Sequence, residues 1–177
     1  YGEISLRLEP LSRGEGRRFE SRLAEEELAP GLVKAAEKGV MESLESGILM
    51  GYPVVDVKAV LTGVGTRETN GSELAFTVAA SMAVREALSK GNAFLLDPIM
   101  AVEVIVPEDF MGEVIGDLNA RGGKIESIEP KLGVQTIKAT VPLAKMFGYS
   151  TSLRSATQGR GTFSMQFSHF DRSNSKQ

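Results

Sequence analysis

The sequence predicts an α+β protein built from two small domains. Its 177 residues are 42% hydrophobic, which is enough for two modest cores. Strand-like segments alternate along the chain with helical segments whose apolar residues recur every four positions. The pattern restarts after Leu95–Pro98, where the proline disfavours helix at the residue before it. We therefore expect domains at residues 1–96 and 97–172, followed by a polar tail at residues 173–177.

The first domain is expected to begin with two strands and a helix. Glu3–Glu9 alternates polar and apolar residues, and Arg17–Leu23 resumes an extended pattern after the turn-rich Pro10–Gly16. A helix is expected from about Pro30, because proline suits a first helical turn, to Gly47. Its apolar residues, which should face a sheet, are Leu32, Ala36, Val40 and Leu44.

A third strand and a second helix complete this domain. The β-branched segment Val54–Leu61 is expected to form the strand and to lead into a glycine-rich loop at residues 62–71. Ser72 can cap the helix that follows, and Lys90-Gly91 marks its end. The apolar residues that share a face of this helix are Leu74, Val78 and Met82.

The second domain is expected to have the order βαββαβ, the ferredoxin-like motif. Its first helix begins near Glu108, ends at Gly122-Gly123 and carries Phe110, Val114 and Leu118 on one side. The other expected elements are strands 101–106, 124–128, 134–141 and 162–170, and a helix at 143–157 that is interrupted near Gly148.

Composition excludes several classes of protein. The chain has no cysteine, so a disulfide framework, a thiol nucleophile and a thiolate metal site are excluded, and a reducing compartment fits. No segment reaches the roughly 20 apolar residues of a membrane span, so we expect a cytoplasmic protein with no membrane partner. The chain starts without Met and directly with a strand, so we expect it to be a piece of a longer protein.

No group of residues indicates a catalytic centre. Gly123–Ile125 lacks the hydroxyl residue of a phosphate-binding loop, and Gly63–Gly65 lacks the third glycine of a dinucleotide-binding turn. His169, the one histidine, has no carboxylate cluster with which to hold zinc. Glu25–Glu27 is typical of a solvated turn before a helix. We expect no enzyme activity from this chain.

Two groups of basic residues allow RNA contact. The net charge of −3 excludes a general basic field, so any contact must be local. Four arginines lie in the segment 13–22, and Arg154 and Arg160 bracket Gln158-Gly159. Arginine forks suit phosphate oxygens, and glycine lets a backbone approach a sugar-phosphate chain. The alternative is an ordinary solvated face with salt bridges.

Five strings of residues resemble translation elongation factor G. They occur in order from about Gly2 to Phe170, and together they are highly specific to that family. The strings are Gly51–Lys58, Asp97–Met100, Phe110–Asn119, Pro142–Tyr149 and Leu153–Gly161.

The resemblance implies the last two domains of that family. The fourth domain would fold like the second domain of a small-subunit ribosomal protein, and the fifth would be ferredoxin-like. A GTPase domain, with its GTP and Mg²⁺, would lie upstream, and this chain would hold no cofactor. The ribosome would be the partner: the fourth domain would contact tRNA and mRNA at the decoding region, and the fifth would contact ribosomal RNA of the large subunit. We expect a monomer.

The resemblance also assigns RNA-contacting positions. They are a tip loop at residues 62–71 and basic or polar positions of the second domain. The residues are Gly63, Val64, Gly65, Thr66, Arg67, Glu68, Thr69, Asn70, Arg121, Arg154, Gln158 and Arg160.

The chain departs from the family pattern at three positions, which leaves the function open. Arg67 stands where histidine is typical, and Gly122 and Ala156 stand where arginine is common. One reading is translocation of tRNA and mRNA in protein synthesis, and a second is a paralogue specialised for ribosome recycling or ribosome protection. A third, from another class, is a small-molecule-binding regulatory module with an apolar pocket between helices and sheet.

Overall fold

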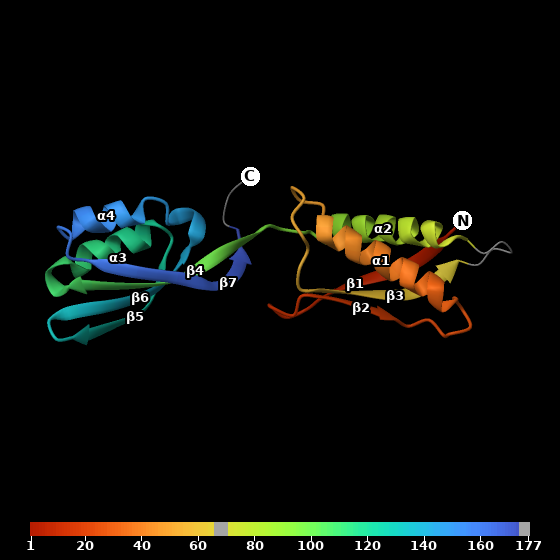
Figure 1. The fold of residues 1–177 in the computed structure, drawn as a ribbon, viewed down its shortest axis with the longest axis horizontal. Helices are drawn as coiled ribbons and strands as arrows, with labels where there is room; N and C mark the ends of the chain where they lie inside the picture. Colours follow the sequence, from red (N-terminus) through yellow and green to blue (C-terminus); the bar gives the residue numbers. More distant parts are fainter. Residues whose placement is uncertain (66–70, 174–177) are drawn as a thin grey trace. The chain divides into compact units, whose positions relative to one another are not determined.

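The computed structural model describes residues 1–65 and 71–173 and divides the chain into two compact units (Figure 1). The first unit is Tyr1–Ala93 and the second is Phe94–Gln177. This division lies three residues before the joint expected at 96/97. Leu96 and Asp97 already belong to the first strand of the second unit, because both pair with the last strand of the chain.

The first unit is a three-stranded sheet with both helices on one face (Figure 1). The strand order is β1-β3-β2, in which β1 is antiparallel and β2 parallel to β3. The expected order of elements is confirmed. The elements are β1 (Glu3–Pro10), β2 (Arg17–Ser21), α1 (Pro30–Ser46), β3 (Val57–Gly65) and α2 (Glu73–Lys90).

Helix α1 packs on the sheet with the stripe that the sequence predicts. Ala36, Val40 and Leu44 are fully buried in one core with Ala59 and Leu61 of β3. On its neighbouring side, α1 approaches α2 closely at Gly39. A Cβ atom added there would stand 2.2 Å from the backbone oxygen of Thr77, so only glycine permits this approach.

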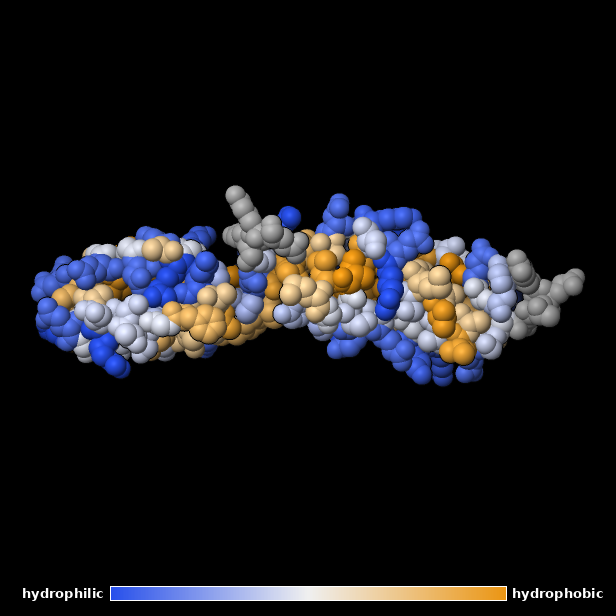
Figure 2. Space-filling view, turned by 90° about the horizontal axis from the view of Figure 1, so that it is seen from above, coloured by the Kyte–Doolittle hydropathy of each residue, from blue (hydrophilic) through white to orange (hydrophobic). Residues whose placement is uncertain are grey.

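Helix α2 buries a different face from the one that the sequence predicted. Leu74, Val78 and Met82 are 71%, 49% and 67% exposed. Figure 2, which looks onto the helices, shows hydrophobic residues at the surface of this unit. Two rows of apolar residues run along α2, and spacing alone does not choose between them. Contact with α1 and β1 buries the other row, which is Phe76, Ala80, Val84 and Leu88.

Strand β3 begins and ends later than expected. The sequence placed a strand at 54–61 and a loop at 62–71, whereas residues 57–65 pair with β1. Asp56, with φ of 58°, turns the chain immediately before β3. At the other end, Ser5 of β1 pairs with Gly63 and Glu3 with Gly65. A partner strand therefore keeps this glycine-rich segment extended, despite its low strand propensity.

The second unit has the expected βαββαβ order and is ferredoxin-like. Its antiparallel sheet has the order β5-β6-β4-β7, with both α-helices on one face (Figure 1). Short 3₁₀ turns at Glu108–Phe110 and Leu143–Lys145 precede the two helices. The strands are β4 (Leu96–Pro107), β5 (Lys124–Lys131), β6 (Val134–Pro142) and β7 (Thr162–Arg172), and the helices are α3 (Met111–Ala120) and α4 (Tyr149–Ala156).

Local signals place the helix boundaries of this unit well. Val114 and Leu118 of α3 are buried, as predicted. The expected interruption near Gly148 is confirmed, since φ of 73° at this residue separates the 3₁₀ turn from α4. Arg172, which the sequence placed at the edge of the tail, is the last residue of β7. Residues 174–177 of the expected tail lie outside the described residues.

Candidate nucleic-acid interface

The arginine-rich segment of the first unit is engaged with carboxylates. Arg17 contacts Glu45 at 2.5 Å, Arg18 contacts Glu15 at 3.1 Å, and Arg22 contacts Glu20 at 3.0 Å. These contacts lie at the surface, where each contributes little to stability. For this segment, they favour an ordinary salt-bridged surface over a site that binds phosphate.

Lys58 extends the same pattern across the sheet. Its ammonium lies 3.1 Å from a carboxylate oxygen of Glu20 and 3.4 Å from one of Glu9. Hydrogen bonds from Arg22 and then Lys58 lower the pKa of Glu20, and the hydrogen bond to Glu20 raises the pKa of Lys58. Positive charge on this surface is therefore matched locally by negative charge, which weakens attraction for phosphate.

The structure divides the expected tip loop. Gly63, Val64 and Gly65 are strand residues of β3, paired with β1, rather than loop residues. This corrects the expected loop conformation of these three residues, and their contact with RNA stays a prediction. The other assigned positions, Thr66, Arg67, Glu68, Thr69 and Asn70, lie outside the described residues.

Arg121 was expected to contact RNA, but its guanidinium is used inside the second unit. Its side chain is only 16% exposed, and its Nε donates to Asp117 at 3.0 Å. Nη1 donates to the carbonyl oxygens of Lys145 at 2.8 Å and Phe147 at 3.1 Å, and Nη2 donates to Ser152 at 3.0 Å. These bonds use four of the five N–H groups of the guanidinium and give Arg121 a structural role.

Three assigned residues lie at or just beyond the end of α4. Arg154 is an exposed residue in the last turn of α4, and Gln158 and Arg160 are exposed in the turn that follows. Gln158 and Gly159 both have positive φ, 53° and 79°, which reverses the chain tightly. Arg160 also lies over the Phe110 ring, with 5.9 Å to its centroid. The structure thus gathers these three polar side chains around one turn.

Buried Thr157 fixes this turn. Its hydroxyl donates to the carbonyl of Leu153 at 2.6 Å and accepts from the amide of Gly161 at 2.9 Å. No Asp or Glu occurs from residue 130 to residue 170, so the whole segment around α4 is neutral or basic. A rigid turn with arginines and no carboxylate of its own can bind phosphate oxygens. This is the best candidate nucleic-acid interface among the described residues.

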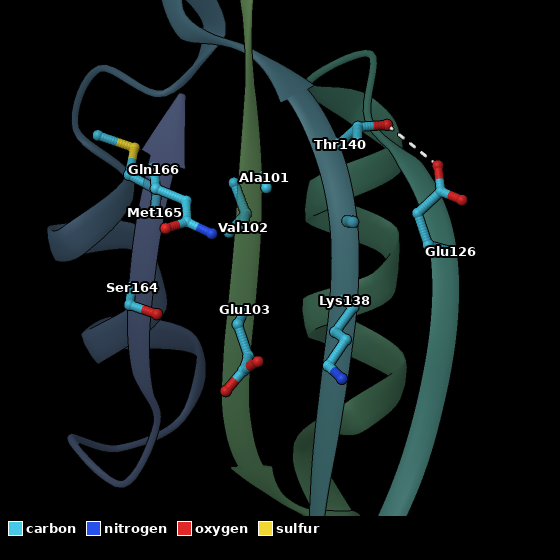
Figure 3. A pocket seen from close by; sticks show the side chains of 10 residues that line it. Ala101, Val102, Glu103, Glu126, Lys138, Thr140, Ser164, Met165 and Gln166 are labelled. Atoms are coloured by element: carbon cyan, nitrogen blue, oxygen red, sulfur yellow. Dashed lines mark hydrogen bonds between the residues drawn. The ribbon is translucent and has the colours of Figure 1, made fainter. Parts of the chain in front are cut away.

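The hollow drawn in Figure 3 bears on the alternative of a metabolite-binding module. It measures about 460 Å³ and lies on the sheet face that the helices leave open. Glu103 and Lys138 stand opposite each other there, and Thr140 donates to Glu126 at 3.3 Å. The apolar pocket that this alternative requires would lie between helices and sheet, so this hollow on the opposite face of the sheet gives it no support.

Residues 1–65 and 71–173 contain neither a membrane-spanning helix nor a metal-binding cluster. No helix there is long and apolar enough to cross a membrane. No group of three or more His, Cys, Asp or Glu side chains there could hold a metal ion.

Two α+β units of this kind, the second ferredoxin-like, define the fold class, and comparison with known proteins identifies the family. Residues 1–92 match the family model for elongation factor G, domain IV, and residues 94–177 match the model for the elongation factor G C-terminus. The chain therefore belongs to the elongation factor G family.

One solved structure is similar to nearly the whole chain. A crystal structure of a protein from Thermus thermophilus is 32% identical, covers 98% of this chain and superposes with a TM-score of 0.84. The match covers 27% of that chain, so the present chain spans about a quarter of its length.

Proposed function

We propose that this chain is the ribosome-contacting part of an elongation factor G-type GTPase and promotes the translocation of tRNA and mRNA. Membership of the family supports interaction with the ribosome. GTP and Mg²⁺ would be bound by another domain of the parent protein. This chain would act in the cytoplasm, as a monomer, and would transmit the hydrolysis step as a change of position rather than as chemistry.

The geometry of the turn after α4 is the main support for RNA binding by this chain. Arg154, Gln158 and Arg160 project from a backbone that Thr157 holds by two hydrogen bonds. Arg154 and Arg160 are exposed and their own segment contains no carboxylate, so phosphate oxygens of ribosomal RNA can reach them. Arg17, Arg18 and Arg22 of the first unit, in contrast, already have carboxylate partners.

The salt dependence of ribosome binding tests this proposal. We expect the isolated chain to bind ribosomes weakly, with log affinity falling linearly with log salt concentration. Arg154→Ala and Arg160→Ala should each reduce the slope by roughly 0.7–0.9, the value for one phosphate contact. Arg18→Ala is the matched control, because Arg18 is paired with Glu15 and its loss should leave the slope unchanged. Binding by the wild-type chain that does not depend on salt would contradict the proposal.

A specialised role in ribosome recycling or protection is the second candidate, favoured by the departures at Arg67 and Ala156. Gly122 bears less on this choice, because φ of 72° there favours glycine for a backbone reason. Replacing Arg67 by His and by Ala in the parent protein, and measuring translocation and ribosome splitting side by side, separates the two roles. A parent protein that splits ribosomes but fails to translocate would replace the first candidate by the second.

A further inference from the structure

Phe147 is the most exposed aromatic side chain among the described residues, at 82%. It lies between the 3₁₀ turn at Leu143–Lys145 and α4. Its neighbours Met146 and Tyr149 are 6% and 1% exposed and belong to the core of the second unit. The loop is therefore anchored on both sides of a ring that itself faces solvent.

The backbone that carries this ring is held in place from α3. The guanidinium of Arg121 donates to the carbonyl oxygens of Lys145 and Phe147, at 2.8 Å and 3.1 Å. The same guanidinium lies 5.1 Å from the centroid of the Tyr149 ring. A partner that binds the Phe147 ring therefore does not have to order the loop, which lowers the entropic cost of binding.

The chemistry around the ring favours an anionic partner with flat apolar groups. Lys145 is exposed two residues before Phe147, and α4 exposes Ser150, Thr151 and Arg154. No carboxylate residue occurs in the sequence from residue 130 to residue 170, and the Asp117 carboxylate of α3 is paired with Arg121. An exposed ring next to basic and hydroxyl groups matches the way in which proteins bind unpaired RNA bases, with stacking on the base and charge on the phosphate.

We propose that Phe147 is a stacking platform for an unpaired base of ribosomal RNA, with Lys145 bound to an adjacent phosphate. Arg121 acts as a positioning residue, since it fixes the loop without touching the RNA. This inference rests on the proposed function and adds to it a contact that depends on an aromatic ring rather than on charge.

The test compares affinity and salt slope for variants of the whole chain with purified ribosomal large subunits. Phe147→Ala should weaken binding by roughly 5-fold to 150-fold, the range for loss of one base stack, and should leave the salt slope unchanged. Phe147→Trp should restore binding, and Phe147→Leu, which keeps an apolar side chain, should not. Lys145→Ala should instead reduce the slope by roughly 0.7, the value for a phosphate of a single strand. Unfolding temperatures of all variants should match the wild type, because both side chains are exposed.

Each other result has a definite meaning. Equal affinity for Phe147→Ala and wild type, while Arg154→Ala still lowers the slope, would overturn the stacking contact and leave the proposed function intact. Rescue by leucine as good as by tryptophan would indicate a simple apolar contact and overturn the stack. A photo-reactive phenylalanine analogue at position 147 should cross-link to RNA, and a cross-link to a ribosomal protein would also overturn it. Wild-type chain that fails to bind at low salt would remove the proposed function and this inference together.

Discussion

Replacing Arg121 by alanine should destabilise the second unit while leaving the first unit unchanged. The substitution removes the four hydrogen bonds that Arg121 makes to Asp117, Lys145, Phe147 and Ser152. It thereby disconnects the end of α3 from the loop before α4 and from α4 itself. Arg154→Ala is the matched control, because the Arg154 side chain is exposed on the same unit.

The expected loss of stability depends on how exposed these hydrogen bonds are, because water can replace an exposed bond. A hydrogen bond to a charged group contributes about 1.5–3 kcal/mol when buried, but Lys145 and Phe147 are exposed, so about 1 kcal/mol for each carbonyl bond is appropriate. The partly exposed pair with Asp117 adds about 0.5 kcal/mol, and the contact with the Tyr149 ring adds about 0.5–1 kcal/mol. With about 0.5 kcal/mol for the bond to Ser152, the free energy of unfolding should fall by about 3.5–4 kcal/mol.

Amide hydrogen exchange during urea unfolding is the appropriate assay, because it reports on the two units separately. In a domain of this size the loss corresponds to a decrease in Tm of roughly 10–30 °C. Amides of β4 to β7 should lose protection at lower urea in Arg121→Ala, while those of β1 to β3 should not. A change below about 0.5 kcal/mol, equal to that of Arg154→Ala, would show that the bonds of Arg121 are not structural.

Three further predictions concern the two cores. Burial raises the pKa of Tyr149 to about 12, so the folded state holds its proton after the unfolded state has lost it. Stability should fall by about 2 kcal/mol between pH 10 and pH 12, and urea titrations of Tyr149→Phe should lack this loss. In α2, Val78→Ser should change the free energy of unfolding by less than about 0.5 kcal/mol in urea titrations, whereas Val84→Ser should cost more than about 2 kcal/mol; equal effects would contradict the packing of this helix. Gly39→Ala should lower the Tm of the first unit, because its Cβ would collide with the backbone of Thr77. This collision should outweigh the preference of alanine for helix, which is about 1 kcal/mol. A raised Tm would show that the two helices can move apart.

The Tyr149→Phe variant also has an expected effect at neutral pH. The Tyr149 hydroxyl is buried and has no hydrogen-bond partner in the described part of the chain. Removing a buried, unpaired polar atom is neutral or stabilising. The free energy of unfolding of Tyr149→Phe at pH 7 should therefore equal or exceed that of the wild type. A decrease of more than about 1 kcal/mol would show that the hydroxyl has a hydrogen-bond partner.

Local chemistry in the sequence determined the order of elements and most helix boundaries. Pro30 and Gly47 bound α1 because their backbone preferences act within a single turn. Ser72 caps α2 through its own side chain, which accepts from the amide of Ala75. Gly148 interrupts the last helical segment for the same kind of local reason. These signals depend on a few neighbouring residues, so they can be read without the fold.

Tertiary structure decided which surfaces are buried and which cations are available. Two apolar rows on α2 are equivalent in sequence, and only contact with α1 and β1 buries one of them. The glycine-rich end of β3 is a strand because β1 lies beside it. Arg121 has the same chemistry as Arg154, yet its partners 24 to 31 residues away remove it from the surface. Sequence patterns specify what a side chain can do, and long-range packing specifies whether solvent or RNA can reach it.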